Sequence, residues 1–163
     1  MAKPLIRAVS VAAAGAWSGD PADSVVLDHD RRQKRRFALT GTVGLAFLVD
    51  LAEAPSLRDG DGLVLEDGRI VRVVAAAEDL AEITARDPLH LARLAWHLGN
   101  RHLATEIGDR AVRIRADHVI EDMARRLGAH VRHVRAPFEP EAGAYGGHSD
   151  GHAHDAGRDR HHG

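Results

Sequence analysis

The sequence predicts an α+β protein in three parts: a small β domain over residues 1–76, a ferredoxin-like βαββαβ domain over residues 77–145, and a disordered His-rich tail over residues 146–163. Three observations lead to this prediction. In the first half, apolar residues alternate between Asp-Gly turn signals, as in paired strands. In the second half, two capped amphipathic helices separate short strands in the order β-α-β-β-α-β. The final residues are rich in glycine and hold five of the 12 histidines, a composition that cannot form a packed core.

Composition excludes several classes of function. The chain has 163 residues, of which 44% are hydrophobic and only 4% aromatic, so its core must be built from Val, Leu, Ile and Ala. The formal net charge of −2 argues against a general polyanion binder. Because there is no cysteine, disulfides and thiolate metal sites are excluded, and any metal must be held by nitrogen and oxygen ligands.

The first residues are not expected to act as an export signal. The run over residues 9–16 is mostly alanine, and Lys3 and Arg7 flank a proline rather than forming a clean basic region. No stretch approaches the ~20 apolar residues that span a bilayer. We therefore expect a soluble cytoplasmic protein with no membrane partner.

The first half is expected to be β throughout, with no helix. Val25 opens an extended segment that runs through a basic stretch to Phe37 and Leu39, and a period-two pattern follows over residues 43–51. Asp-Gly turns, which supply the positive φ of tight hairpins, then join two short strands. These turns and strands are "RDGDG" (58–62), residues 63–65, "EDG" (66–68) and residues 70–74.

The second half begins with a short strand over residues 80–85 and continues into a helix. Asp87 is the N-cap, and Pro88 takes the first helical position, where its missing N–H has no cost. Gly99 and Asn100 end this helix. Its apolar stripe consists of Leu91, Leu94, Ala95 and Leu98.

Two strands, a second helix and a last strand complete this half. The strands, residues 105–107 and 111–114, flank a turn at Gly108 and Asp109. The second helix has Asp117 as its N-cap and Gly128 as its C-terminal stop. Its apolar face consists of Ile120, Met123, Ala124 and Leu127, and the last strand contains Val131 and Val134.

His118 is the most informative single residue. It falls in the first turn of the second helix, and a helical wheel places it with Glu121, Asp122 and Arg125, away from the apolar face. An ordinary exposed histidine is one interpretation. The other is a metal ligand, because the partial positive charge of a helix N-terminus keeps an imidazole neutral. A two-fold axis in a homodimer would bring two such rings together and double the ligand count.

Two further histidines, His130 and His133, lie on the expected last strand. Their odd spacing points them to opposite faces of a regular strand. They can share one ion only if the strand is bulged or a dimer mate supplies the second ligand, and ordinary surface histidines remain the alternative. His90 and His97, which share a helix face with arginines, are interpreted as structural.

The tail offers a third set of metal ligands, which comprises His148, His152, His154, His161 and His162. Aspartates interleave with these histidines, so the pattern differs from an expression tag. A flexible glycine-rich chain holds ions with modest affinity because its ligands are not preorganised. An all-imidazole set suits Ni(II), Cu(II) and Zn(II), and chemistry alone does not choose among them.

The run "DRRQKRRF" over residues 30–37 is strongly basic. A nucleic-acid patch is one interpretation, but no aromatic platform lies beside it and the whole chain is slightly acidic. We favour a solvated strand face or a docking surface, over residues 31–36, for an acidic partner protein, and no nucleic-acid partner. We find no catalytic constellation and predict that the chain is not an enzyme.

Several segments together resemble the UreE family, the urease accessory nickel metallochaperones. They occur in family order and cover most of the chain from about residue 24. "HLGNRH" and "DHVIEDM" are the most specific, on the expected βαββαβ pattern and followed by a His-rich tail. The matching stretches are "DRRQKRRFAL", "LRDGDGLVLEDGRIVRV", "HLARLAWHLGNRHLATEI", "DHVIEDMARRLGAHV" and "PFEPEAGAYGGH".

The resemblance implies a peptide-binding type of N-terminal domain and a ferredoxin-like, metal-binding C-terminal domain that forms a homodimer. It implies that nickel binds between two copies of the histidine in the "DHV" motif, here His118. Secondary ligands are implied on the last strand, where His130 and His133 are the local candidates, and in the tail. It also implies delivery to the urease accessory GTPase and, through it, to the apo-urease assembly complex.

Three hypotheses about function follow. The first is a nickel carrier for urease maturation. The second is a general buffer or storage protein for divalent nickel, zinc or copper, in which the tail is the whole function. The third is a peptide-binding, chaperone-like module in which metal binding is incidental.

Overall fold

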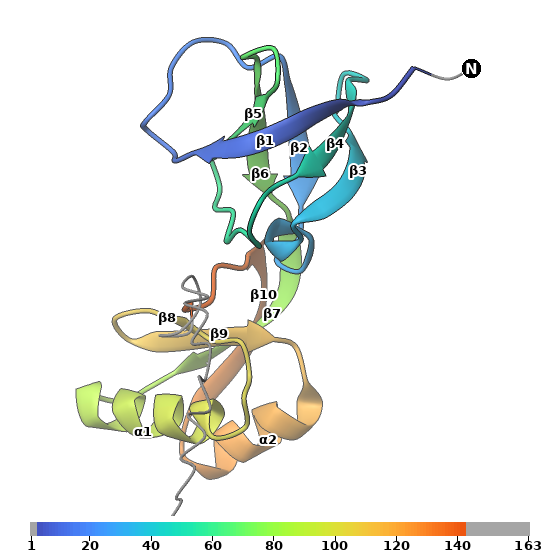
Figure 1. Cartoon of the computed structure of the whole chain (residues 1–163). Coiled ribbons are helices and arrows are strands. Elements are labelled where there is room, and N and C mark those ends of the chain that lie inside the picture. Colours follow the sequence, from blue (N-terminus) through green and yellow to red (C-terminus); the bar gives the residue numbers. More distant parts are fainter. Residues whose placement is uncertain (1–2, 143–163) are drawn as a thin grey trace, which may run out of the picture.

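The structure, a computed structural model, describes residues 3–142. It has two parts, each organised around one β-sheet (Figure 1). The first half of the chain forms a six-stranded sheet, and the second half forms a four-stranded sheet with both α-helices on the side away from the first half (Figure 1). This agrees with the predicted α+β class and with a β part that precedes a mixed part.

The six strands of the first sheet pair in the order β2-β6-β5-β1-β4-β3. Their core contains Phe47, Leu63, Leu65 and Val71, all almost fully buried. The strands are β1 (Ile6–Ala12), β2 (Asp23–Leu27), β3 (Arg36–Thr40), β4 (Ala46–Asp50), β5 (Gly62–Leu65) and β6 (Ile70–Ala75).

Strand β1 lies inside this sheet although its own sequence did not predict it. It pairs parallel with β4 and antiparallel with β5, so hydrogen bonds hold it on both sides. Its side chains are mostly small or exposed, with Ala8 fully buried and Val9 and Val11 each 40% exposed. The large buried side chains beside β1 belong to the neighbouring strands β4 and β5. The sequence of β1 alone therefore gave little indication of a strand.

The basic stretch departs from the prediction of one continuous extended segment. Residues Arg31–Gln33 form a short 3₁₀ helix, η1, between β2 and β3, so the expectation of no helix in this half was wrong. The Asp28 carboxylate starts the turn by accepting a hydrogen bond from the Arg31 N–H at 2.8 Å. Such local side-chain to backbone bonds compete with strand pairing.

Asp23, at the start of β2, is buried and organises the turn between β3 and β4. Its carboxylate accepts hydrogen bonds from the N–H groups of Ser24, Val43 and Leu45 and from the Thr42 hydroxyl. Gly41 leaves the space that this requires, because a Cβ there would lie 2.1 Å from an Asp23 oxygen. Burial alone would raise the pKa of Asp23, but the hydrogen bonds lower that pKa below its ordinary value.

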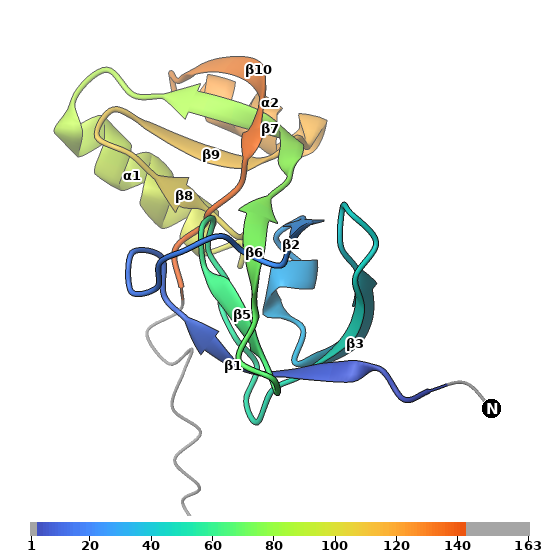
Figure 2. The ribbon, with the colours of Figure 1, turned by 90° about the horizontal axis from the view of Figure 1, so that it is seen from above.

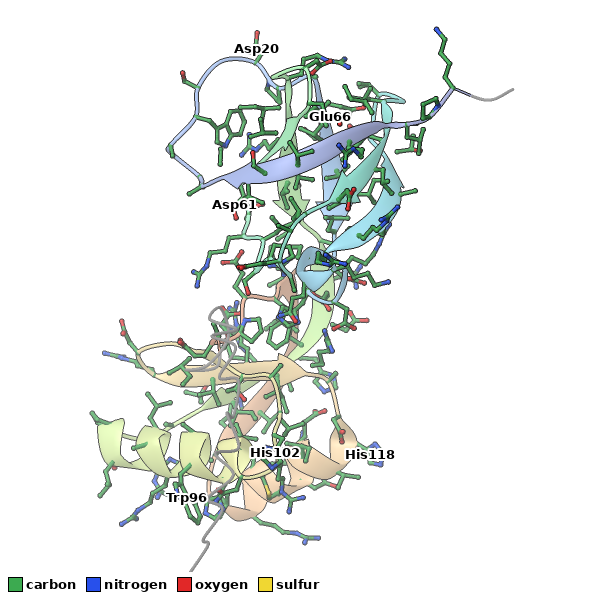
Figure 3. All side chains as sticks on the ribbon, viewed as in Figure 1. Asp20, Asp61, Glu66, Trp96, His102 and His118 are labelled. Atoms are coloured by element: carbon green, nitrogen blue, oxygen red, sulfur yellow. The ribbon has the colours of Figure 1, made fainter. Side chains whose placement is uncertain are left out.

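We expect Asp23→Asn to lower the thermal midpoint at neutral pH, because an amide cannot accept all of these bonds. A carboxyl with a lowered folded-state pKa stabilises the fold above its unfolded pKa, about 3.9, and loses this effect as pH falls through the folded pKa. The difference in thermal midpoint between the variant and the wild type should therefore shrink only at acidic pH. Calorimetry from pH 7 to pH 3 measures this, with the exposed Asp20 changed to Asn as the control (Figure 3). Equal midpoints at neutral pH would contradict the assignment.

The second half follows the predicted order β-α-β-β-α-β, and its strands pair in the order β10-β7-β9-β8. Asp87 accepts a hydrogen bond from the His90 N–H, and Asp117 accepts from the N–H groups of Val119 and Ile120, as predicted for N-caps. The elements are β7 (Ala77–Thr84), α1 (Pro88–Gly99), β8 (Glu106–Ile107), β9 (Ala111–Arg115), α2 (His118–Arg126) and β10 (His130–Pro137). The predicted apolar faces of both helices pack on the sheet around Ala81, Ile83, Val112 and Ile114.

A buried phenylalanine joins the two halves. The segment after β10 runs back from the second sheet toward the first (Figure 2), and its Phe138 is fully buried. The Phe138 ring packs edge-on against His29 and lies under the Arg115 guanidinium. The buried Arg32 donates hydrogen bonds to the carbonyl oxygens of Phe138 and Leu57. Burial, together with the nearby charges of Arg32 and Arg115, lowers the pKa of His29.

Among residues 3–142, we find no helix that is long and apolar enough to cross a membrane.

Candidate metal-binding site

His118 is the first residue of α2 and is exposed. Figure 3 places it at the outer end of the helix, at the periphery of the molecule. The next residue, Val119, is 59% exposed although it is apolar. An imidazole and an apolar side chain therefore stand together on an accessible surface of the second half.

The two strand histidines point to opposite faces, as their spacing predicted. Strand β10 pairs with β7 in continuous antiparallel register, from His130 opposite Thr84 to Pro137 opposite Ala77, so the strand has no bulge. His133 lies opposite Ala81, which belongs to the core under the helices. His130 therefore projects from the other face of the sheet, and the two rings cannot meet at one ion within one chain.

Glu121 is the residue of this region that sequence reasoning misplaced. It was assigned to the exposed side of α2, but it is only 3% exposed. One carboxylate oxygen accepts a hydrogen bond from the Asp117 N–H at 2.9 Å, and the other contacts Nε2 of His133. The available signal was its position four residues after an N-cap, close to the spacing of a capping box.

His90 is structural, as interpreted from the sequence. Its ring is buried, and Nδ1 accepts a hydrogen bond from the Arg86 N–H at 3.0 Å. Nε2 therefore carries the proton and donates to the Leu127 carbonyl at 2.8 Å, which ties α1 to the end of α2. His97 is partly buried and packs edge-on against Trp96.

The described part of one chain does not hold a complete metal-ligand set. Within residues 3–142, no three His, Asp or Glu side chains gather closely enough to bind one ion. The predicted tail ligands His148, His152, His154, His161 and His162 lie outside the described residues.

One residue of the basic run is not on the surface, because Arg32 is 2% exposed and donates hydrogen bonds to Leu57 and Phe138 at the junction between the two halves. Arg31, Lys34, Arg35 and Arg36 are exposed. Arg31 also lies over the ring of Phe37. The expectation of a strand was therefore wrong for the η1 residues, Arg31–Gln33. The expectation of a solvated side chain was wrong for Arg32 alone among the basic residues of this run.

Comparison with known families identifies both halves of the chain. The model of the UreE urease accessory protein N-terminal domain matches residues 3–76, and the model of the C-terminal domain matches residues 78–163. The chain belongs to the UreE family. The resemblance inferred from the sequence motifs is thereby confirmed.

UreE relatives match over nearly the whole chain. A urease accessory protein UreE from Bradyrhizobium sp. strain BTAi1 is 60% identical over 151 residues, which cover 93% of this chain and 73% of the relative. One from Rhodopseudomonas palustris strain HaA2 is 57% identical over 150 residues, 92% of this chain and 70% of the relative. One from Chelativorans sp. strain BNC1 is 49% identical over 160 residues, 97% of this chain and 99% of the relative.

UreE proteins are urease accessory proteins and not enzymes. This confirms the prediction that the chain is not an enzyme. The shared name of the family and of these relatives gives them an accessory role toward urease.

Proposed function

We propose that this chain binds Ni(II) between two protomers at His118 and delivers it, through the urease accessory GTPase, to apo-urease in its assembly complex. The observation that carries the proposal is the exposed imidazole at the first position of α2, in a chain of the UreE family. The neutral imidazole of a histidine binds metal through a ring nitrogen, and at the exposed start of α2 this ring is accessible to an ion.

A homodimer through the C-terminal domain, residues 77–145, completes this site. The strand order β10-β7-β9-β8 and the two helices on one face support a ferredoxin-like domain. A two-fold axis near the start of α2 would bring two His118 rings together and remove both copies of Val119 from water. The ligand set then comes from both protomers, which accords with the incomplete set in the described part of one chain.

An exposed ion with few fixed ligands exchanges readily, and this property suits transfer better than storage. His133, His130 and the tail histidines would supply further ligands in turn as the ion moves. Imidazole nitrogen suits Ni(II), and Zn(II) or Cu(II) would also fit the same donors. The proposed location of the protein is the cytoplasm. The proposed role of the N-terminal domain, residues 1–76, is that of a peptide-binding type of domain.

Deleting the tail, residues 146–163, separates the carrier from a general metal buffer. We expect the shortened protein to keep one tightly bound Ni(II) per dimer, because the His118 pair is outside the deleted segment. Isothermal titration with nickel, together with the mass of the particle before and after loading, measures this. Loss of nearly all nickel binding would instead show that the tail is the whole function.

A further inference from the structure

Helix α1 carries apolar side chains on its outer side as well as on its inner side. Leu94 and Leu98 are buried and pack on the sheet. Leu89 and Trp96 lie on the opposite side of the helix, two turns apart, and are 61% and 63% exposed. Figure 3 places Trp96 on the side of α1 that faces away from the first half of the chain. These two large side chains therefore add little to the core and form part of an accessible surface.

The charges on this surface are all positive. Helix α1 contains no Asp or Glu, and the Asp87 carboxylate before it is engaged as the N-cap. Arg93 is exposed and shares the outer side of the helix with the two apolar residues, because it lies four residues after one and three before the other. Arg101 is exposed just beyond the helix end. We call this surface the α1 face, and it consists of Leu89, Ala92, Arg93, Trp96 and Arg101.

The arginines of the α1 face differ from those of the sheet in their partners. Every arginine of β9 and β10 forms an ion pair with a carboxylate, namely Arg113, Arg115, Arg132 and Arg135. Among the ion pairs that residues 3–142 form, none includes Arg93 or Arg101. The guanidinium groups of the α1 face are therefore available to the carboxylates of another molecule.

We propose that the α1 face docks against an acidic, partly apolar surface of the protein that receives the metal. This inference rests on the proposed function, in which the receiver is the urease accessory GTPase. Charge complementarity determines the kind of partner, because exposed guanidinium groups pair with carboxylates. Tryptophan and arginine are also the residue types that dominate the binding free energy of many protein interfaces, and the α1 face presents both.

Two other occupants fit the α1 face less well. A second copy of the chain, with its α1 face against the first, would bring two sets of arginines together, and facing like charges oppose binding. A lipid surface accepts the continuous apolar side of a helix, whereas Arg93 here lies between Leu89 and Trp96. An acidic protein surface satisfies the apolar and the charged groups together.

Binding of the full chain, loaded with nickel, to the purified urease accessory GTPase tests the inference by isothermal titration. Trp96→Ala should weaken the binding by about 10-fold or more. Arg93→Glu should weaken it by about 10-fold and reduce its dependence on salt between about 50 mM and about 500 mM NaCl. Val43→Ala and Arg36→Glu, exposed changes in the other half, are the matched controls and should bind as the wild type does.

Parallel measurements separate the other occupants. Nickel titration and the thermal midpoint should match the wild type in Trp96→Ala and Arg93→Glu, because both side chains are exposed and neither is a proposed ligand. Wild-type affinity for the GTPase in both variants, or a fall in Arg36→Glu alone, would overturn the inference.

Two further results would also overturn it. One is a Trp96→Ala chain that becomes monomeric, which would assign the α1 face to a second copy. The other is binding to vesicles of equal parts phosphatidylcholine and phosphatidylglycerol that requires Trp96, with the GTPase affinity unaffected. If the nickel-loaded wild type does not bind the GTPase at all, it is the delivery step of the proposed function that fails, and the inference fails with it.

Discussion

His118→Ala is expected to abolish tight nickel binding, because one substitution removes the proposed ligand from each protomer of the proposed dimer. The nickel affinity should fall by more than about 100-fold, because removing a residue that only hydrogen-bonds to a metal ligand already lowers the affinity by up to about 100-fold. The thermal midpoint should stay unchanged, since the side chain is exposed at the helix start. Isothermal titration of the full chain measures the affinity at the tightest site. His97→Ala, on α1, is the histidine control.

The same variant tests the role of this site in cells. Urease activation should fall when nickel is scarce and recover when excess nickel is supplied, because the carrier raises delivery at low concentration. Full activation in His118→Ala cells under nickel limitation would contradict the carrier and favour a peptide-binding module in which metal is incidental.

Phe138→Ala is expected to give the largest loss of stability, about 3–5 kcal/mol in the free energy of unfolding. The ring is fully buried and contacts His29 and Arg115, so its removal leaves a cavity between the two halves. Arg32 would also lose part of the packing that surrounds its buried hydrogen bonds. Urea unfolding, followed by circular dichroism, measures the change.

Phe138→Leu is the matched variant, because leucine refills part of the cavity and should lose clearly less stability. A loss below about 1 kcal/mol in Phe138→Ala would mean that this ring does not hold the junction together.

Local sequence rules were sufficient to predict the two helices and the directions of the side chains on the last strand. Asp87 and Asp117 act as N-caps through hydrogen bonds to residues two or three positions away, and the sequence therefore predicted both helix starts. The first-turn position of His118 follows from the same cap. The opposite directions of His130 and His133 follow from strand periodicity alone, since the register is regular.

Residues whose roles depend on distant partners were not predictable in this way. Arg32 resembles its basic neighbours in sequence, yet it is buried because its partner carbonyls belong to Leu57 and Phe138. Glu121 lies on the polar side of a helical wheel, yet β10 covers it and His133 contacts it. Strand β1 is held by β4 and β5 rather than by its own pattern. Each of these contacts joins residues far apart in the chain, which periodicity does not report.

Anomalous diffraction from crystals of the full chain loaded with one Ni(II) per dimer tests the central claim most directly. We predict a single nickel peak on the two-fold axis, within coordination distance of an imidazole nitrogen of His118 from each protomer, about 2 Å. Nickel bound only at other residues, with the two His118 rings far apart in the dimer, would contradict it.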